Sequence, residues 1–246
     1  MIVLVAVTGL VAGFINTLAA GGSNLTIPAL MIMGLPADIA NATNRVGVMM
    51  QSVGGLRGFH ALGRLPRDDL PAILLPTIIG SVIGSALVVV LSAELLKPLL
   101  LITMISLTII MLVRPHDLNH AHGTEALRVT ESRTAPWLLF FAGVYGGFVQ
   151  AGVGFVLIAA LAGALRYDLV SATAIRLACT LVFTAVALVI FIIDDLVMWI
   201  PGLILGVSSM LGASIGVRVA INVSPKVLRW FLLIMTVCAS VAALLS

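Results

Sequence analysis

Long apolar stretches separated by short polar segments run along most of this chain. A helix that crosses the roughly 30 Å hydrocarbon core of a bilayer needs about 20 predominantly apolar residues, and most of the stretches reach that length. The pattern therefore predicts an all-α fold, namely a polytopic helical membrane protein with about eight hydrophobic segments. These segments are residues 2–33, 37–56, 70–92, 96–113, 136–165, 169–193, 196–217 and 227–245.

The composition of the 246 residues supports a lipid environment. Hydrophobic residues make up 61% of the chain and charged residues 9%, whereas soluble domains carry roughly 25% charged residues. Because an exterior in water needs polar side chains, this composition excludes a water-soluble domain and makes the lipid bilayer the expected surrounding. The net charge of +3 comes without a concentrated basic stripe, so no nucleic-acid partner is expected.

The only long polar segment divides the chain into two parts of similar length. It predicts a first membrane repeat at residues 1–113, a polar cytoplasmic linker at 114–135 and a second membrane repeat at 136–246. The linker carries His116, His120 and His122, whose spacing resembles a metal site. We interpret these histidines as part of a solvated loop, so neither a metal nor a cofactor is expected.

Several landmarks recur in the two parts at a constant spacing. When the second part is aligned on the first so that Gly21 falls on Gly152, Arg45 falls on Arg176. A shift of this alignment by a single position brings Gly84 onto Gly216 and Ser92 onto Ser224. Internal duplication of this kind is common in secondary transporters.

Basic residues indicate that the two repeats are inverted relative to each other. Cytoplasmic loops of membrane proteins are rich in Lys and Arg. In the first repeat the basic loop is 57–69, whereas in the second repeat it is 218–229. The loop around Asp194 and Asp195, which corresponds to 57–69, carries no basic residue. The basic loop thus changes position between the repeats, as inversion requires.

Inversion needs an odd number of crossings in each repeat, which three ordinary segments supply. The long glycine-interrupted segment at the start of each repeat must then turn back within the membrane. In 136–165 the break at 150–154 leaves two arms of roughly 14 residues, or about 21 Å each, too short to span the core. We therefore expect a re-entrant hairpin in each repeat. The alternative is four parallel spans per repeat, which places the basic loop 218–229 outside.

The two hairpin tips are candidate binding sites. Irregular backbone at membrane depth is tolerated only where it is buried in protein or lines a wet cavity. Glycines let the chain turn and expose N–H groups, and the helix N-terminus that follows attracts anions. The alternative is that these glycines only permit close helix packing. The candidate residues are Gly21, Gly22, Ser23 and Asn24 in the first tip and Gln150, Gly152 and Gly154 in the second.

Arg45 and Arg176 each lie about eight residues, or about 12 Å, inside an apolar segment. A charge at that depth normally faces a cavity or a partner, and no acidic residue lies within one helical turn of either arginine. Two such cations could form a receptor for an oxyanion, which the guanidinium fork fits well. Asn44 could line the same path or bond a neighbouring helix. The alternatives for the arginines are snorkelling towards the interface or helices that begin later.

Several motifs resemble the TauE/SafE sulfite exporter family. They are Gly13-Phe-Ile-Asn-Thr-Leu-Ala-Ala-Gly-Gly-Ser-Asn-Leu-Thr-Ile-Pro-Ala-Leu30, Gly34-Leu-Pro36, Ala42-Thr-Asn-Arg45 and Gly143-Val-Tyr-Gly-Gly-Phe-Val-Gln-Ala-Gly-Val-Gly154. The resemblance implies a multi-pass permease of the bacterial inner membrane with two homologous halves, which moves sulfite, thiosulfate, sulfonates or related organic anions. Ser23 and Asn24 stand where many members continue with glycine, and Arg45 where lysine is frequent, so the identity of the substrate stays open.

The leading hypothesis is a secondary transporter that exports a small anionic substrate by alternating access and is not an enzyme. The chain has no Walker motif, so ATP is not the direct driver. The sequence leaves open whether a proton or sodium ion is coupled to transport and whether the chain forms a homodimer. The alternatives are an anion uptake permease, a non-transporting membrane assembly protein and an intramembrane enzyme, although the chain has no HExxH or GxSxG motif.

Overall fold

The computed structural model describes residues 2–19, 22–66, 68–113 and 126–219. All regular structure in these ranges is helical, without a β-strand, which confirms the predicted all-α class. The expected last hydrophobic segment, 227–245, and the three linker histidines lie outside the described residues. The helices are α1 Ile2–Ala19, α2 Ser23–Ile32, α3 Ala37–Ala61, α4 Leu70–Val90, α5 Ala93–Val113, η1 Val129–Glu131, α6 Ala135–Phe148, α7 Val153–Ile158, η2 Ala159–Ala164, α8 Leu169–Ile193 and α9 Trp199–Val219.

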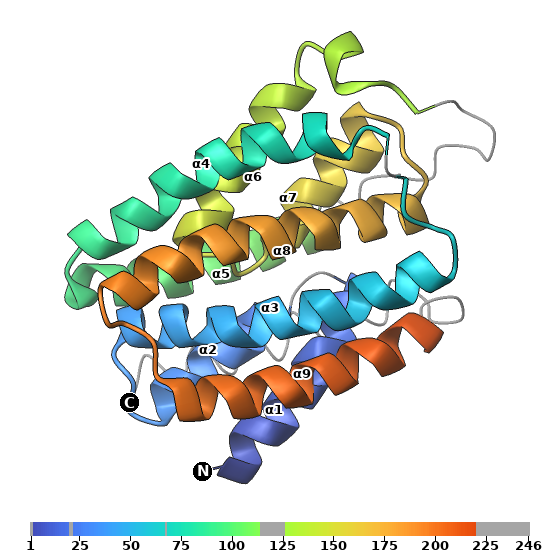
Figure 1. The fold of residues 1–246 in the computed structure, drawn as a ribbon. Helices are drawn as coiled ribbons and strands as arrows, with labels where there is room; N and C mark the ends of the chain where they lie inside the picture. The colour runs from blue at the N-terminus through green and yellow to red at the C-terminus, as the bar shows by residue number, and fades with distance from the viewer. Residues whose placement is uncertain (1, 20–21, 67, 114–125, 220–246) are drawn as a thin grey trace.

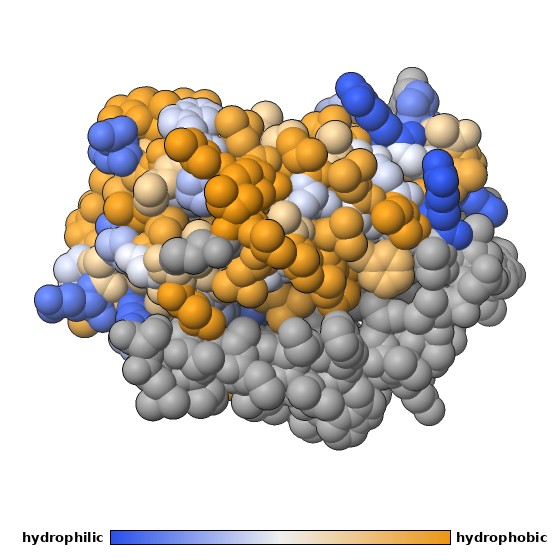
Figure 2. All heavy atoms as spheres, turned by 90° about the horizontal axis from the view of Figure 1, so that it is seen from below, coloured by the Kyte–Doolittle hydropathy of each residue, from blue (hydrophilic) through white to orange (hydrophobic). Residues whose placement is uncertain are grey.

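Three of the described helices are long and apolar enough to cross a membrane, namely α4, α8 and α9. Large apolar side chains point outwards from them, for example Leu75 and Ile200, which are 61% and 74% exposed. Figure 2 shows hydrophobic residues over the middle of one face and hydrophilic residues gathered towards its left and right ends. A lipid-facing belt explains this distribution, because exposed apolar surface of this extent is not tolerated in water.

Two helices are interrupted where the sequence predicts hairpin tips. The first helix break lies between the end of α1 at Ala19 and the start of α2 at Ser23, and the second lies between the end of α6 at Phe148 and the start of α7 at Val153. In the second break Gln150 and Gly152 have φ angles of 62° and 76°, so the chain leaves the right-handed helical region there. The arm that follows begins at Val153, just inside the predicted break at 150–154, and continues as the π-helical segment η2.

Loops shorten where the helices extend beyond their predicted ends. The basic loop predicted at 57–69 begins only after Ala61, so Arg57 lies on the last turns of α3.

Asp168 begins α8 as its N-cap, where its carboxylate accepts hydrogen bonds from the backbone N–H groups of Val170 and Ser171. Partial burial raises the pKa of Asp168, but these hydrogen bonds and the nearby Arg64 outweigh burial and lower it. The cap sets where α8, the helix of Arg176, starts.

The helices form two groups that mix the two parts of the chain. In one group α1 and α3 pack against α9, and in the other α6 and α8 pack against α4. The two groups meet where α3 and α8 lie side by side (Figure 1). The sequence division at the linker 114–135 therefore does not separate the packing groups. Each interrupted helix contacts a helix from the other side of the linker.

Close backbone approaches hold the α1–α9 and α4–α6 pairs together. A Cβ atom on Gly13 of α1 would overlap the backbone of Ser209 in α9, and one on Gly143 of α6 would overlap the backbone of Thr77 in α4. Small residues at such positions let membrane helices approach closely enough for dispersion contacts to stabilise the pair. The glycines thus fix the positions of the interrupted helices, whose ends lie near the centre of the protein.

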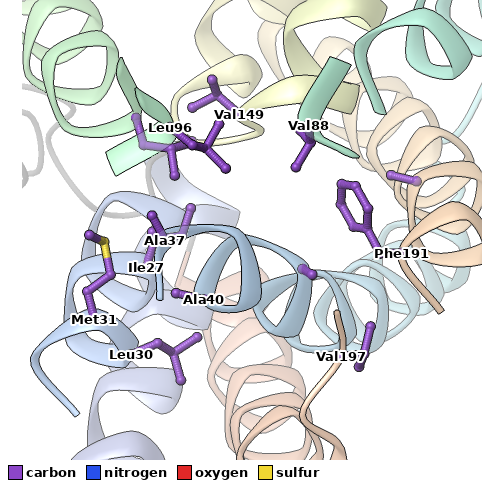
Figure 3. Packing of buried hydrophobic residues seen from close by; sticks show 14 of the residues in the cluster. Ile27, Leu30, Met31, Ala37, Ala40, Val88, Leu96, Val149, Phe191 and Val197 are labelled. Atoms are coloured by element: carbon purple, nitrogen blue, oxygen red, sulfur yellow. The ribbon is translucent and has the colours of Figure 1, made fainter. Parts of the chain in front are cut away.

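Apolar side chains fill the space around the helix breaks. Figure 3 shows Ile27 of α2, Ala40 of α3, Leu96 of α5, Val149 of the second break and Phe191 of α8 gathered where these elements meet. All five are fully buried. Polar groups buried beside this apolar cluster must therefore find hydrogen-bond partners within the protein.

The close approach of α4 and α6 predicts a sharp effect of added bulk. Gly143→Ala should destabilise the fold by about 1–3 kcal/mol, because the new methyl group must displace backbone atoms. Gly163→Ala is the matched control, since nothing lies within 4 Å of a Cβ built there. Thermal unfolding in detergent should show a lower Tm for Gly143→Ala alone. Equal Tm values for the two variants would contradict the tight α4–α6 contact.

Candidate functional site

Arg45 lies in the middle of α3 with its side chain fully buried. Its guanidinium donates hydrogen bonds to the backbone carbonyl of Gly146, to that of Gly147 at 2.7 Å and to that of Phe148 at 3.3 Å. These are the last three residues of α6. The final carbonyls of a helix have no partner within it and carry partial negative charge, so Arg45 satisfies the C-terminal end of α6.

Arg176 takes the equivalent position at the other helix break. It lies on α8, is 1% exposed, and its Nη2 donates to the carbonyl oxygen of Asn16 at 2.8 Å. Asn16 belongs to the last turn of α1. The alignment that places Arg45 on Arg176 also places Asn16 on Gly147. Each arginine therefore binds the end of the interrupted helix in the other part of the chain.

The two arginines differ in how many acceptors they reach. Arg45 binds three carbonyls and its guanidinium carbon lies 5.5 Å from the ring centroid of Phe191, within cation–π range. The amide of Asn41, one helical turn earlier, donates to the Phe148 carbonyl at 2.8 Å. For Arg176, Asn16 is the hydrogen-bond acceptor recorded within the described part of the chain. Within the described residues, Arg45 thus reaches more acceptors than Arg176.

The first helix break is tied to α3 by Asn44. Its Oδ1 accepts from the hydroxyl of Thr26, and its Nδ2 donates to the Ser23 hydroxyl oxygen at 3.3 Å. Gly22 donates its backbone N–H to Oδ1 of Asn16 at 3.3 Å, which links the first turn of α2 to the end of α1. Asn44 therefore positions the start of α2. Of the two roles considered for it from the sequence, these contacts match hydrogen bonding to a neighbouring helix.

The second helix break is held by two side chains. The hydroxyl of Tyr145 donates to the carbonyl of Ala151 at 2.7 Å, across the turn. Nε2 of Gln150 donates to the hydroxyl oxygen of Thr184 on α8 at 2.8 Å. Gln150 is thereby fixed against the helix that carries Arg176.

A small cavity, called the central cavity below, lies between the two helix breaks. It has room for about one water molecule. α1, α2, α3, α7, α8 and the second break all contribute to its wall. Its lining residues are Asn16, Ser23, Val48, Gln150, Val153, Gly154, Arg176 and Thr180.

The central cavity contains some of the predicted site residues and omits others. Ser23, Gln150, Gly154 and Arg176 line it, as predicted for parts of one site. The remaining predicted residues that the structure describes do not line the cavity. These are Arg45, Gly22, Asn24, Asn44 and Gly152, while Gly21 lies outside the described residues.

Four lining residues were not among the candidate site residues, although the sequence allows Thr180 to line the path or bond a neighbouring helix, as it does for Asn44. Asn16 is a polar residue inside an apolar segment, seven positions before Ser23, and this signal could have identified it. Thr180 follows Arg176 by four positions and so shares its helix face. Val48 and Val153 are apolar residues in apolar segments, and no sequence signal distinguishes them.

The charge of the site is entirely positive within the described residues. Arg45 and Arg176 are the charged members of the buried polar set there, and that set includes no aspartate or glutamate. Nε of Arg176 and Oε1 of Gln150 are buried without a hydrogen-bond partner in the described structure. The residues that line the cavity thus include a cation, two hydroxyl side chains and a glutamine whose carbonyl oxygen has no partner in the described structure.

The unequal bonding of the arginines predicts unequal effects on stability. Arg45→Gln removes the guanidinium donor from three carbonyls of α6, of which Phe148 keeps the Asn41 amide and Gly147 the Ser85 hydroxyl. It should lower the Tm in detergent clearly, since hydrogen bonds to charged groups contribute about 1.5–3 kcal/mol each. Arg176→Gln removes one recorded bond and should lower it less. Arg57→Gln, on the exposed end of α3, is the control and should leave the Tm unchanged. A Tm drop for Arg176→Gln that exceeds that of Arg45→Gln would refute this ranking.

Curated relatives are similar to this chain along most of their length. "Probable membrane transporter protein ORF9" of Sinorhizobium sp is 26% identical over 239 residues, which cover 97% of this chain and 90% of the relative. A "Probable membrane transporter protein" of Haemophilus influenzae is 25% identical over 234 residues, covering 93% and 88%. "Probable membrane transporter protein YfcA" of Escherichia coli K12 is 28% identical over 234 residues, covering 94% and 85%.

The same extent of similarity appears at the level of the family. The family model described as sulfite exporter TauE/SafE matches residues 5–243, which include both helix breaks and both buried arginines. This match agrees with the motifs found around residues 13–45 and 143–154. The chain therefore belongs to the TauE/SafE sulfite exporter family of membrane transporters.

Proposed function

We propose that this protein is a secondary transporter that exports small anions such as sulfite, thiosulfate or organosulfonates, and that the central cavity is its substrate site. The observation that carries the proposal is the position of Arg176. Arg176 is 1% exposed, is one of the residues that line the cavity between the two helix breaks, and has no buried carboxylate near it within the described residues.

Energetics favour an anion as the missing partner. A buried charge without a counter-ion is costly in a membrane protein and normally marks a substrate or ion pathway. A small oxyanion in the cavity would neutralise Arg176 and could accept hydrogen bonds from its guanidinium. The hydroxyl groups of Ser23 and Thr180, which line the same wall, would supply further donors.

The two arginines take different roles in this proposal. Arg176 would contact the substrate directly, because it lines the cavity. Arg45 would be a positioning residue, since its donors reach three carbonyls of α6 and it is not among the lining residues. The receptor of two converging cations predicted from the sequence is thereby replaced by one contact arginine and one arginine that holds the opposite helix.

The size of the cavity supports alternating access. With room for about one water molecule, the cavity must widen before it can admit an oxyanion. Widening would require the two helix breaks to separate, which relative motion of the two helix groups could produce. Both breaks would then expose the site in turn to each side of the membrane.

Helix directions support the inverted repeat and the re-entrant hairpins. In Figure 1, α3 runs from left to right and its sequence counterpart α8 runs from right to left. Residues 62–66 after α3 and the loop 194–198 after α8 consequently lie at opposite ends of the molecule. We propose that the basic loop 62–69 faces the cytoplasm and that 194–198 faces the other side.

Transport should depend on the charge of Arg176. In proteoliposomes, Arg176→Gln should lower the affinity for labelled sulfite by about tenfold or more, because a charged hydrogen bond is lost. Arg176→Lys should recover part of this loss, since it keeps the charge but not the fork. Arg57→Gln serves as the control and should transport normally. Unchanged affinity in Arg176→Gln would remove the central cavity as the anion site.

Cysteine labelling tests the proposed inverted arrangement. In a chain whose Cys179 and Cys238 are replaced by alanine, Arg64→Cys and Asp195→Cys both present an exposed site, on loops at opposite ends. An impermeant maleimide should label Arg64→Cys from the cytoplasmic side and Asp195→Cys from the other side. Labelling of both positions from one side would rule out the inverted arrangement without affecting the anion site.

A further inference from the structure

Gln150, one of the residues that line the central cavity, carries an acceptor atom that no described group bonds. Gln150 is 2% exposed, and its Oε1 is buried without a hydrogen-bond partner in the described structure. Its Nε2 is occupied, because it donates to the hydroxyl oxygen of Thr184 at 2.8 Å. The amide thus has a hydrogen bond at its nitrogen and none at its oxygen within the described structure.

The orientation of this amide follows from α8. Arg176, Thr180 and Thr184 recur every four residues, so they lie along one face of the helix. Arg176 and Thr180 line the cavity, and Thr184 holds the Gln150 amide beside them. A single guest in the cavity can therefore meet the guanidinium and the Gln150 amide at once.

The Arg176 guanidinium and the Gln150 carboxamide oxygen require opposite hydrogen-bonding groups on a bound ligand. A guanidinium only donates hydrogen bonds, so it needs an anionic oxygen. A carboxamide oxygen only accepts, so it needs an O–H or N–H group. Leaving a buried carbonyl unpaired is unfavourable, and a ligand that supplies the missing donor removes that penalty. The hydroxyl groups of Ser23 and Thr180 can serve either demand and do not discriminate between guests.

We infer that the central cavity selects a monoanion that carries its own O–H or N–H donor, with Gln150 as the residue that recognises the donor. This inference rests on the proposed function, since it assigns specificity to the same site. One lining cation matches one negative charge, and one unused acceptor matches one donor. Among sulfur oxyanions this chemistry favours hydrogen sulfite over the sulfite dianion. Among sulfonates it favours those with a hydroxyl or amino group near the sulfonate.

A pair of probes of equal size tests the inference directly. Hydroxyethanesulfonate and propanesulfonate have the same number of non-hydrogen atoms and the same single charge, but only the first carries a hydroxyl group. Binding of each to the purified full chain, measured by calorimetry, should favour hydroxyethanesulfonate by roughly tenfold, the usual effect of one satisfied hydrogen bond. Sulfate, a dianion without a donor, should bind more weakly than either.

Replacement of the acceptor provides the matched variant. Gln150→Met keeps an unbranched side chain of similar length but has no amide oxygen. It should reduce the affinity for hydroxyethanesulfonate to that for propanesulfonate, while propanesulfonate binding persists and reports an intact site. A tenfold gap that persists in Gln150→Met would overturn the role of Gln150.

The comparison in the wild-type chain also decides the question without any variant. Equal affinity for the two sulfonates, or tighter binding of propanesulfonate, would overturn the inference and leave an anion site with another basis of selection. Tightest binding of sulfate would overturn it as well, because the site would then prefer a dianion. Failure of all three probes to bind would instead refute the anion site itself, and the inference with it.

Discussion

Both interrupted helices end inside the protein on an arginine from the other part of the chain. A helix that stops at membrane depth leaves carbonyl groups that water cannot reach, and such groups must be satisfied within the protein. Arg45 binds the last carbonyls of α6, and Arg176 binds the carbonyl of Asn16 at the end of α1. The attraction between each cation and the negative end of the helix offsets part of the cost of burying the charge. These two contacts therefore stabilise the burial of both helix breaks at the centre of the fold.

The contacts also explain why helices from both parts of the chain are mixed. An arginine on α3 can reach the end of α6 only if the two helices are brought together, and the glycine contacts of α6 with α4 fix that position. The α1–α9 pair does the same for Arg176. The central cavity is therefore complete only when both parts of the chain are present, which suits a transporter whose site must change its exposure as helix groups move.

Equivalent backbone positions do not carry equivalent side chains around the cavity. In the alignment of Arg45 on Arg176, Ser23 corresponds to Gly154 and Asn16 to Gly147. The first break thus contributes a hydroxyl and an amide where the second contributes bare backbone, and only Arg176 of the two arginines lines the cavity. A symmetric framework with asymmetric side chains can bind a small asymmetric solute in one orientation. This asymmetry is the basis of the specificity inferred for Gln150.

The sequence by itself determined the all-α class, the membrane environment, the two helix breaks and the pair of buried arginines, because apolar length, glycine position and charge depth are local properties. It did not reveal that the arginines bind backbone carbonyls far away along the chain, since every residue has a carbonyl and composition does not mark the ones left unpaired. Nor could it show which arginine faces the cavity. The stretch of α3 around Arg45 and the stretch of α8 around Arg176 are buried on all sides, so no polar face indicates where each guanidinium points. Only the packing of α3 and α8 between the two helix groups decided that Arg176 lines the cavity and that Arg45 holds a helix end.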